Sequence, residues 1–234
     1  MKTGIIVLCR YSSSRLRGKI LKKINGKTIL SVVIDQLKLN FSNDQIVVAT
    51  SDHETDEKIV NHCINNQINY FVGDLDNVSK RFLDCANKYN FDYAVRINGD
   101  NVFIDSKSLD SMLKIAESNT YDLITNVPGR TFPYGMSIEI VNINYYKSVI
   151  SSFSKENKEH VTNWLYDNAD LVNSYVFLND KFLNLKGIKL AVDSEKDLKN
   201  CELIYKKIGF KDPVSLKNIS NALTDSNVLN HYLK

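Results

Sequence analysis

Cationic side chains cluster near the N-terminus, around a run of three serines. The apolar residues 4–8 are followed at once by CRYSSSRLRGKIL, which contains Arg10, Arg15, Arg17 and Lys19 around Ser12, Ser13 and Ser14. Serines favour turns with exposed N–H groups, and Arg and Lys side chains bind phosphate oxygens. The segment matches neither the P-loop nor the GxGxxG pattern. It indicates either a loop that binds an anion or a solvated basic turn.

Two aspartates follow other apolar runs and could hold a divalent cation. Asp100 lies in NGDN directly after residues 93–97, and Asp193 follows residues 190–192. Carboxylates bind Mg²⁺ together with the phosphates of a nucleotide. Asp100 could instead form a turn, and Asp193 could instead cap the next helix. For each aspartate, the sequence therefore leaves open both a metal-binding role and a structural role.

Strand-like and helix-like segments alternate along most of the chain. Apolar runs typical of buried strands occur at residues 5–8, 46–49, 70–72, 93–97 and 123–125, with helical spacing between them. This alternation predicts an α/β fold of three α/β/α layers around a mainly parallel sheet. Because ligands bind at the carboxyl ends of parallel strands, we expect loops 10–19, 98–105 and 193–197 to form one site. Their charges fit a nucleoside triphosphate with a divalent cation.

The pattern loosens after residue 126, where turn signals begin. We expect a strand over 136–141 that leaves or edges the sheet, a helix over 158–168 and a strand over 174–178. A short strand over 190–192, a helix over 197–208 and a helical tail to residue 234 complete the prediction. No linker divides the chain, so we expect one domain over 1–234, with residues 127–180 as an acceptor-binding or dimerisation subregion.

The composition excludes several classes of protein. A net charge of +3 in 234 residues gives no global field for wrapping nucleic acid. No apolar run approaches the roughly 18 residues of a membrane helix, and the N-terminus has no signal-peptide pattern. The four cysteines form neither a CxxC pair nor a zinc spacing, so we expect reduced thiols in a cytoplasmic protein.

Several motifs, in the same order, resemble those of a known family. IIVLCRYSSSRLRGKIL resembles the N-terminal signature of the cytidylyltransferase family that includes CMP-Kdo and CMP-acylneuraminate synthetases. It is most similar to the spore coat polysaccharide biosynthesis protein F branch, whose opening reads like ARxxSxRLPGKxL. The later segments that resemble this branch are FVGDLDNVSKRF, VRINGDNVFID, TFPYGMSIEI, EHVTNWLYDN and LAVDSEKDL. The resemblance covers residues 1 to about 210.

The resemblance implies a nucleotide-diphospho-sugar transferase-like fold and Mg²⁺-dependent transfer of CMP from CTP to an acceptor, with release of pyrophosphate. The implied catalytic residues are Arg15, Lys19 and Asp100. The implied nucleotide-binding residues are Arg10, Ser12, Ser13, Ser14, Arg15, Lys19 and Arg81. The implied Mg²⁺ ligands are Asp100 and Asp193, and the implied acceptor-binding residues are Glu139, Glu159 and His160. The implied partners are CTP, a small anionic acceptor such as an acidic sugar or another surface-polysaccharide precursor, and a second copy of the chain.

Three departures and two alternatives stay open. Arg17 and Phe103 stand where the family has prolines, and Ser137 stands where a second carboxylate is expected, which bears on acceptor recognition. The first alternative is a nucleotidylyltransferase with another donor or with a phosphate or phosphonate acceptor. The second alternative is a nucleotide-binding protein without catalysis.

Overall fold

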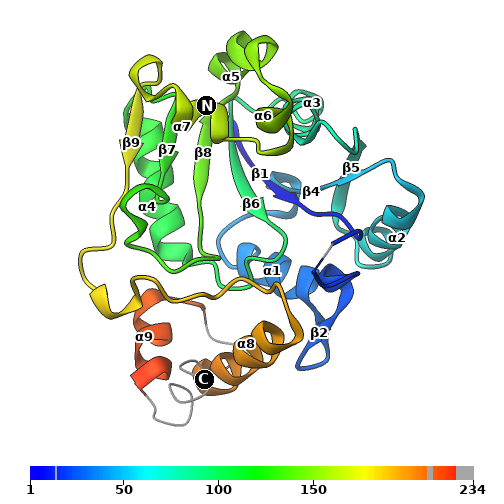
Figure 1. The fold of residues 1–234 in the computed structure, drawn as a ribbon, viewed down its shortest axis with the longest axis vertical. Coiled ribbons are helices and arrows are strands. Elements are labelled where there is room, and N and C mark those ends of the chain that lie inside the picture. Colours follow the sequence, from blue (N-terminus) through cyan, green and yellow to red (C-terminus); the bar gives the residue numbers. More distant parts are fainter. Residues whose placement is uncertain (14, 210–212, 225–234) are drawn as a thin grey trace.

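A central β-sheet organises the computed structural model, which describes residues 1–13, 15–209 and 213–224 (Figure 1). Within these residues, the sheet has seven strands in the order β5-β4-β1-β6-β8-β7-β9. The strands are β1 (Thr3–Leu8), β4 (Ile46–Ser51), β5 (Asn69–Gly73), β6 (Tyr93–Asn98), β7 (Leu123–Thr125), β8 (Glu139–Asn142) and β9 (Ser174–Val176). A separate hairpin joins β2 (Lys23–Ile24) and β3 (Lys27–Thr28).

The sheet is mainly parallel, as the alternating pattern predicts. β5, β4, β1 and β6 are parallel neighbours, and β9 is parallel to β7. β8 runs antiparallel to both β6 and β7. The prediction that residues 136–141 leave or edge the sheet was therefore wrong, because β8 lies inside it. The amide of Asn126 donates to the carbonyl of Met136 and accepts from the N–H of Ile138, which folds the chain back after β7.

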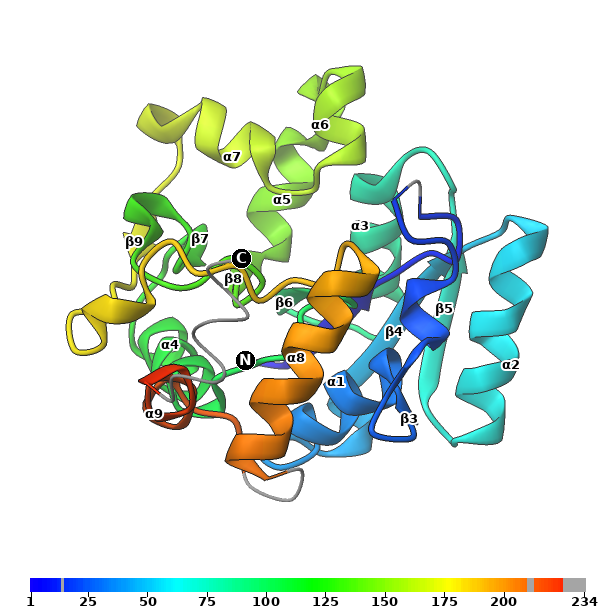
Figure 2. The same cartoon turned by 60° about the horizontal axis from the view of Figure 1, so that its bottom comes forward.

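Helices cover both faces of the sheet, so the three-layer prediction is confirmed. The helices are α1 (Ile29–Leu37), α2 (Glu57–Asn65), α3 (Val78–Lys88), α4 (Ser106–Ser118), α5 (Ile143–Val149), α6 (Lys155–Glu159), α7 (Asn163–Asp167), α8 (Glu195–Ile208) and α9 (Leu216–Thr224). Side chains of α1, α2, α4, α8 and α9 share one buried apolar cluster with one face of the sheet. Side chains of α3, α5 and α7 share a second cluster with the opposite face. Figure 2 shows α5, α6 and α7 on the side opposite α1, α8 and α9.

The helix predicted over residues 158–168 has a different form in the structure. The expected helix over 158–168 is two short helices, α6 and α7, which are separated at residues 160–162. The carbonyl of Val161 accepts a 2.7 Å hydrogen bond from the buried Tyr146 hydroxyl, and the Val161 side chain is buried. The chain therefore leaves the helical path there, and the hydroxyl of Ser79 on α3 donates to the carbonyl of Asn157 on α6.

The predicted strand over 190–192 was wrong, although Leu190 and Val192 are fully buried. This segment lies beside residues 134–136 and pairs with them through one isolated parallel bridge, between Tyr134 and Lys189. A Cβ atom on Gly135, which has a φ of +92°, would lie 2.4 Å from the nitrogen of Ala191. The close crossing therefore requires glycine. The predicted helix over 197–208 is confirmed as α8, and α9 forms part of the predicted tail, whose residues 225–234 lie outside the described chain.

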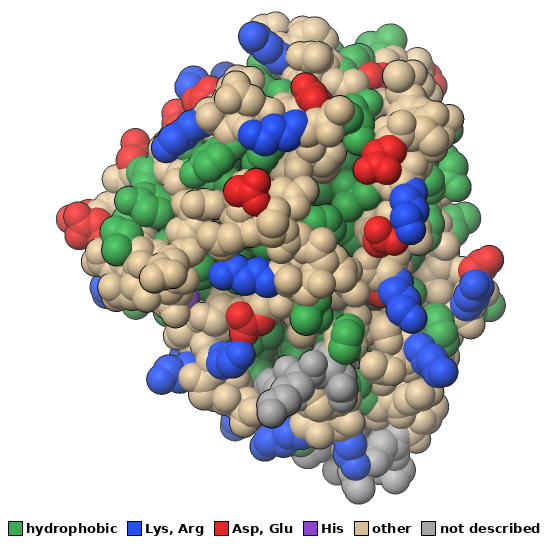
Figure 3. Space-filling view, turned by 180° about the vertical axis from the view of Figure 1, so that it is seen from behind, with side chains coloured by type: hydrophobic (Ala, Val, Ile, Leu, Met, Phe, Trp, Pro, Cys, Tyr) green, Lys and Arg blue, Asp and Glu red, His purple; other side chains and the backbone are tan. Residues whose placement is uncertain are grey.

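The surface carries charges of both signs. On the face in Figure 3, Asp and Glu side chains are interspersed with Lys and Arg side chains in the upper part, whereas Lys and Arg predominate toward the bottom. In the described chain, no helix is long and apolar enough to cross a membrane.

β9 lies at the edge of the sheet and exposes Tyr175 and Val176. It belongs to the subregion 127–180, whose role in dimerisation stays a prediction.

Candidate active site

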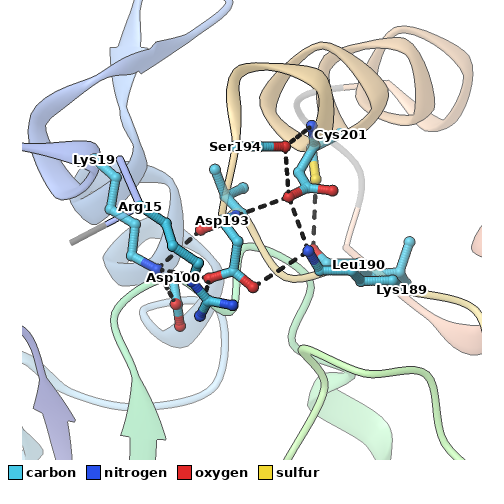
Figure 4. A network of polar contacts seen from close by, with 10 residues as sticks. Arg15, Lys19, Asp100, Lys189, Leu190, Asp193, Ser194 and Cys201 are labelled. Carbon is cyan, nitrogen blue, oxygen red and sulfur yellow. Dashed lines mark hydrogen bonds and ion pairs between the residues drawn. The ribbon is translucent and has the colours of Figure 1, made fainter. Parts of the chain in front are cut away.

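The three loops expected to meet do meet, and Lys19 joins them (Figure 4). The Lys19 ammonium lies 2.5 Å from Oδ2 of Asp100 and 3.2 Å from Oδ1 of Asp193. Nη2 of Arg15 lies 2.9 Å from the same Asp193 oxygen. Residues from three distant parts of the sequence thus form one network at the carboxyl ends of β1 and β6.

Local backbone geometry positions Lys19 at this network. The N–H of Gly18 donates to the carbonyl of Tyr11, which closes the serine loop, and Lys19 begins a short 3-10 helix. Gly18 has a φ of +68°, and a Cβ atom there would lie 2.9 Å from the Tyr11 ring. Glycine therefore permits both the left-handed backbone and the close approach to the ring. The loop is a built feature rather than an unconstrained basic turn.

Asp56 anchors the same loop, a role that the sequence does not indicate. Its buried carboxylate accepts from the N–H of Tyr11 at 2.7 Å, the hydroxyl of Thr50 at 2.8 Å, and both the N–H and the hydroxyl of Ser51 at 3.0 and 2.5 Å. Burial acts to raise the pKa of Asp56, but these hydrogen bonds outweigh it and lower the pKa below its ordinary value. In the sequence, a carboxylate near the start of a helix indicates a favourable interaction with the helix dipole. Only the fold shows that Asp56 holds the loop after β1.

We predict that Asp56→Asn destabilises the fold in a pH-dependent way. An amide cannot accept from four donors, so the free energy of unfolding should fall by about 1–3 kcal/mol at pH 7. Because the folded pKa is lowered, the stabilisation by Asp56 is complete above its unfolded pKa of about 3.9 and is lost as pH falls through the folded value. Urea denaturation should therefore show a large difference at pH 7 that shrinks toward pH 2. The control is Asp52→Asn on the exposed neighbouring position; a pH-independent difference for Asp56→Asn would contradict the linkage.

Asp193 does not cap the following helix. Ser194 is the N-cap of α8, and its hydroxyl accepts from the N–H of Asp197. The carboxylate of Asp193 instead accepts from Lys19 and Arg15 and pairs with Lys189 at 3.2 Å. Burial acts to raise the pKa of Asp193, but Lys19 and Lys189 outweigh it and lower the pKa. Asp193 is therefore held ionised and faces the other two loops.

Asp100 lies in a turn, as one of the two interpretations of the sequence predicts. The turn after β6 is real, because the N–H of Asn101 donates to the carbonyl of Asn98 and the N–H of Gly99 donates to the carbonyl of Leu8. The turn also directs the Asp100 carboxylate to the Lys19 ammonium.

The donor set fits a cation that arrives with a nucleotide. Among the described residues, no group of three or more His, Cys, Asp or Glu side chains could hold a metal by itself. Asp100 and Asp193 both lie within 3.2 Å of the same Lys19 nitrogen, so their carboxylates are close together. Mg²⁺ commonly takes one or two protein carboxylates and completes its octahedral shell with phosphate oxygens and water. The assignment of Asp100 and Asp193 as Mg²⁺ ligands stays a prediction.

Two neighbouring cavities meet at this network. The first, of about 320 Å³, is lined by most of the predicted site residues: Arg10, Ser13, Arg15, Lys19, Arg81, Asp100, Glu159 and His160. The second, of about 470 Å³, is lined by Tyr134, Ser137, Lys189 and Asp193. Arg15, Asn98 and Asp100 line both cavities. A group bound at Asp100 is therefore accessible from two sides.

Some predicted site residues lie elsewhere. Ser12 is exposed and is not among the residues that line either cavity, and Ser14 lies outside the described residues. Arg10 and Glu159 do line the first cavity, and there they form an ion pair with an N–O distance of 3.8 Å. Glu139 is 1% exposed and lies beneath the cavity rather than in its wall.

The buried Glu139 belongs to a polar unit that the sequence did not reveal. Glu139 lies directly opposite Arg96 in the β6–β8 ladder and pairs with its guanidinium. The hydroxyl of Tyr166 donates to the other carboxylate oxygen at 2.6 Å. Burial acts to raise the pKa of Glu139, but the Arg96 charge and these hydrogen bonds lower it. The sequence signal was the pair of motifs VRINGD and SIEI, but their register became visible only in the sheet.

Comparison with known proteins agrees with this fold. A family model described as cytidylyltransferase matches residues 4–207. The chain is 26% identical over 226 residues to the spore coat polysaccharide biosynthesis protein SpsF of Bacillus subtilis, covering 93% of this chain and 92% of that protein. A cytidylyltransferase structure from Leptospira borgpetersenii has a TM-score of 0.90 at 26% identity, covering 99% of this chain and 97% of the other. A structure of CMP:2-keto-3-deoxy-manno-octonic acid synthetase complexed with CTP shares the fold, with a TM-score of 0.66 at 17% identity over 88% of this chain and 99% of the other.

The chain belongs to the cytidylyltransferase family, because the family model spans most of its length. It is accordingly a nucleotidyltransferase, as the sequence motifs predict. The non-catalytic alternative is therefore not favoured.

Proposed function

We propose that the protein transfers CMP from CTP to an acidic sugar or a related surface-polysaccharide precursor and releases pyrophosphate. The observation that carries the proposal is the convergence of Arg15, Lys19, Asp100 and Asp193 at the junction of two cavities. A transfer between two small molecules needs two binding spaces that meet at the charged group where bonds change. The two cavities and the shared Asp100 provide that arrangement.

The first cavity suits the nucleotide. Ser13 and the cations Arg10, Arg15 and Lys19 line it, and these groups match the several negative charges of a triphosphate. Asp100 and Asp193 would hold Mg²⁺, which supplies charge neutralisation at the phosphates when bound. Lys19 lies beside both carboxylates and Arg15 lies beside Asp193, so the two cations are placed to neutralise the pyrophosphate as it leaves. Phosphoryl-type transfers depend mainly on such positioning and electrostatics.

The second cavity suits the acceptor, although Glu159 and His160, which the resemblance implies as acceptor-binding residues, line the first cavity. Tyr134 and Ser137 offer hydroxyl groups, and Arg15 and Lys189 offer positive charge, so the lining suits a hydroxylated anion. An acceptor oxygen would attack the α-phosphorus in line, forming the new P–O bond as the bond to the pyrophosphate oxygen breaks. The proton of an acceptor hydroxyl would pass to water or to a carboxylate of the site. The name of SpsF, a spore coat polysaccharide biosynthesis protein, supports an acceptor from polysaccharide synthesis.

The test is release of pyrophosphate in the presence of CTP and Mg²⁺ with defined acceptors. Eight- and nine-carbon acidic sugars should support turnover, and the corresponding neutral sugar alcohols should not. Turnover with a simple phosphate or phosphonate, and none with acidic sugars, would move the activity to another acceptor class. No release above the acceptor-free rate with every acceptor would contradict the proposed reaction.

A further inference from the structure

One arginine beside the second cavity carries a charge that no carboxylate of the described chain neutralises. Arg130 is exposed, and within the described residues it makes no ion pair and no side-chain hydrogen bond. Its guanidinium instead lies over the ring of Tyr134, 5.0 Å from the ring centre. Tyr134 forms part of the wall of the second cavity. The stacked guanidinium is thus held against that wall, and its N–H donors can meet an anion.

The other cations at this cavity are already paired with carboxylates. Lys189 lies 3.2 Å from Asp193 and 2.9 Å from Asp197, and Figure 4 shows Lys189 beside Asp193. Arg15 lies 2.9 Å from the same Asp193, and under the proposed function it turns to the pyrophosphate. An anion that entered the cavity would therefore compete with carboxylates for Arg15 and Lys189. Arg130 offers its charge without such competition.

The backbone fixes both members of the stacked pair. Arg130 has a φ of +49°, a left-handed conformation that is uncommon for a long side chain. Its neighbour Thr131 accepts hydrogen bonds from the N–H and the side-chain amide of Asn179, at 2.9 and 3.1 Å. The N–H of Tyr134 donates to the carbonyl of Ile188 at 2.8 Å. Because a conformation of this energy persists only where neighbouring contacts impose it, the loop sets the direction of the Arg130 side chain.

We infer that Arg130 binds the anionic group of the acceptor and so determines the preference for acidic acceptors. The inference rests on the proposed function, which places the acceptor in the second cavity. Asp100 and Tyr134 both line that cavity, so an acceptor that spans it from Asp100 to Tyr134 would meet Arg130 at its far end. Under that function the anionic group is the carboxylate of an acidic sugar, which a guanidinium can bind through two parallel N–H donors.

The test measures pyrophosphate release at saturating CTP and Mg²⁺ over a range of concentrations of an eight- or nine-carbon acidic sugar. Arg130→Met should raise KM for the sugar by about 10- to 100-fold, the effect of one lost charge-assisted contact. The value of kcat should stay within about 3-fold, and KM for CTP should not change, because the contact serves acceptor binding only. Arg130→Lys keeps the charge without the planar fork, so its KM for the sugar should be intermediate.

Two further comparisons separate an effect of charge from an effect on structure. Ser137→Asp adds a carboxylate to the cavity wall, so it should raise KM for the sugar more than the neutral Ser137→Asn does. Added salt should raise the KM of the wild type more than that of Arg130→Met, because salt screens the contact that the variant lacks. The control is Lys147→Met, which removes an exposed cation from α5 and should leave these constants unchanged. Melting temperatures establish that each variant is folded.

Three results would overturn the role of Arg130. The first is a KM for the sugar within about 2-fold of wild type in the folded Arg130→Met variant. The second is an equal rise in KM for the sugar and for CTP, because Arg130 would then act on the whole site. The third is an equal KM for Ser137→Asp and Ser137→Asn, which would exclude an anion at this cavity. If the wild type releases no pyrophosphate with any acceptor, the proposed function itself fails, and the inference fails with it.

Discussion

Asp100→Asn should reduce the rate of pyrophosphate release about 1,000-fold or more while leaving the protein folded. Asp100 lies at the junction of the two cavities, 2.5 Å from Lys19, and is the carboxylate best placed between the two substrates. Removing one preorganised electrostatic contact from a transfer site commonly costs a factor of about 100 to 1,000, and loss of a metal ligand costs more. Lys19 would retain its contact with Asp193, so the free energy of unfolding should change by less than about 1 kcal/mol.

The matched control for Asp100 is Asp110→Asn, which removes an exposed carboxylate from an i,i+4 pair on α4. It should keep wild-type turnover. Turnover of the folded Asp100→Asn variant within 10-fold of wild type would rule out Asp100 as a metal ligand or a catalytic residue. Initial rates measured over a range of Mg²⁺ concentrations would separate a lost metal ligand, which shifts the Mg²⁺ requirement, from a lost positioning contact.

Lys19→Met should have two effects of opposite sign. CTP affinity should fall by about 10- to 100-fold, because a charge-assisted contact to the triphosphate is lost. Binding of Mn²⁺ without nucleotide should become tighter, because Lys19 occupies both Asp100 and Asp193 in the free protein and its removal frees them. Calorimetric titration measures the first effect, and electron paramagnetic resonance of free Mn²⁺ measures the second.

Arg17→Met is the control for Lys19 in the same loop. Arg17 is exposed and does not line either cavity, so both titrations should match those of the wild type. Weaker binding of both CTP and Mn²⁺ in Lys19→Met would contradict the competition between Lys19 and the cation. Unchanged CTP affinity would contradict the assignment of Lys19 to the triphosphate.

The sequence predicts the parts of the site that depend on local pattern. The apolar runs before the serine loop and before Asp100 became β1 and β6, which are parallel neighbours in the sheet. Parallel strands end at the same edge, so the two loops had to meet there. The sequence also predicts that Lys19 lies in this loop, whereas the turn at Gly18 that positions its side chain is seen only in the structure.

Features that depend on contacts between distant segments could not be predicted in the same way. The alternation of Met136 to Val141 is weak, and only the side chain of Asn126 shows that β8 returns into the sheet. Asp56 looks like a residue at a helix start, and its hydrogen bond to Tyr11 joins positions 45 apart. Leu190 and Val192 are as apolar as a strand, but the crossing at Gly135 leaves them without a regular strand partner. In each case a polar or glycine contact decided between conformations that the hydrophobic pattern allowed.

The most direct test of the proposed function is calorimetric binding of CTP, UTP, ATP and GTP, each with and without Mg²⁺. Cations at the serine loop and carboxylates at Asp100 and Asp193 predict binding that requires Mg²⁺, and the proposed reaction predicts that CTP binds most tightly. Tighter binding of another nucleotide would contradict the donor assigned here. Binding of no nucleotide, with or without Mg²⁺, would contradict the assignment of the network around Lys19 as a triphosphate site.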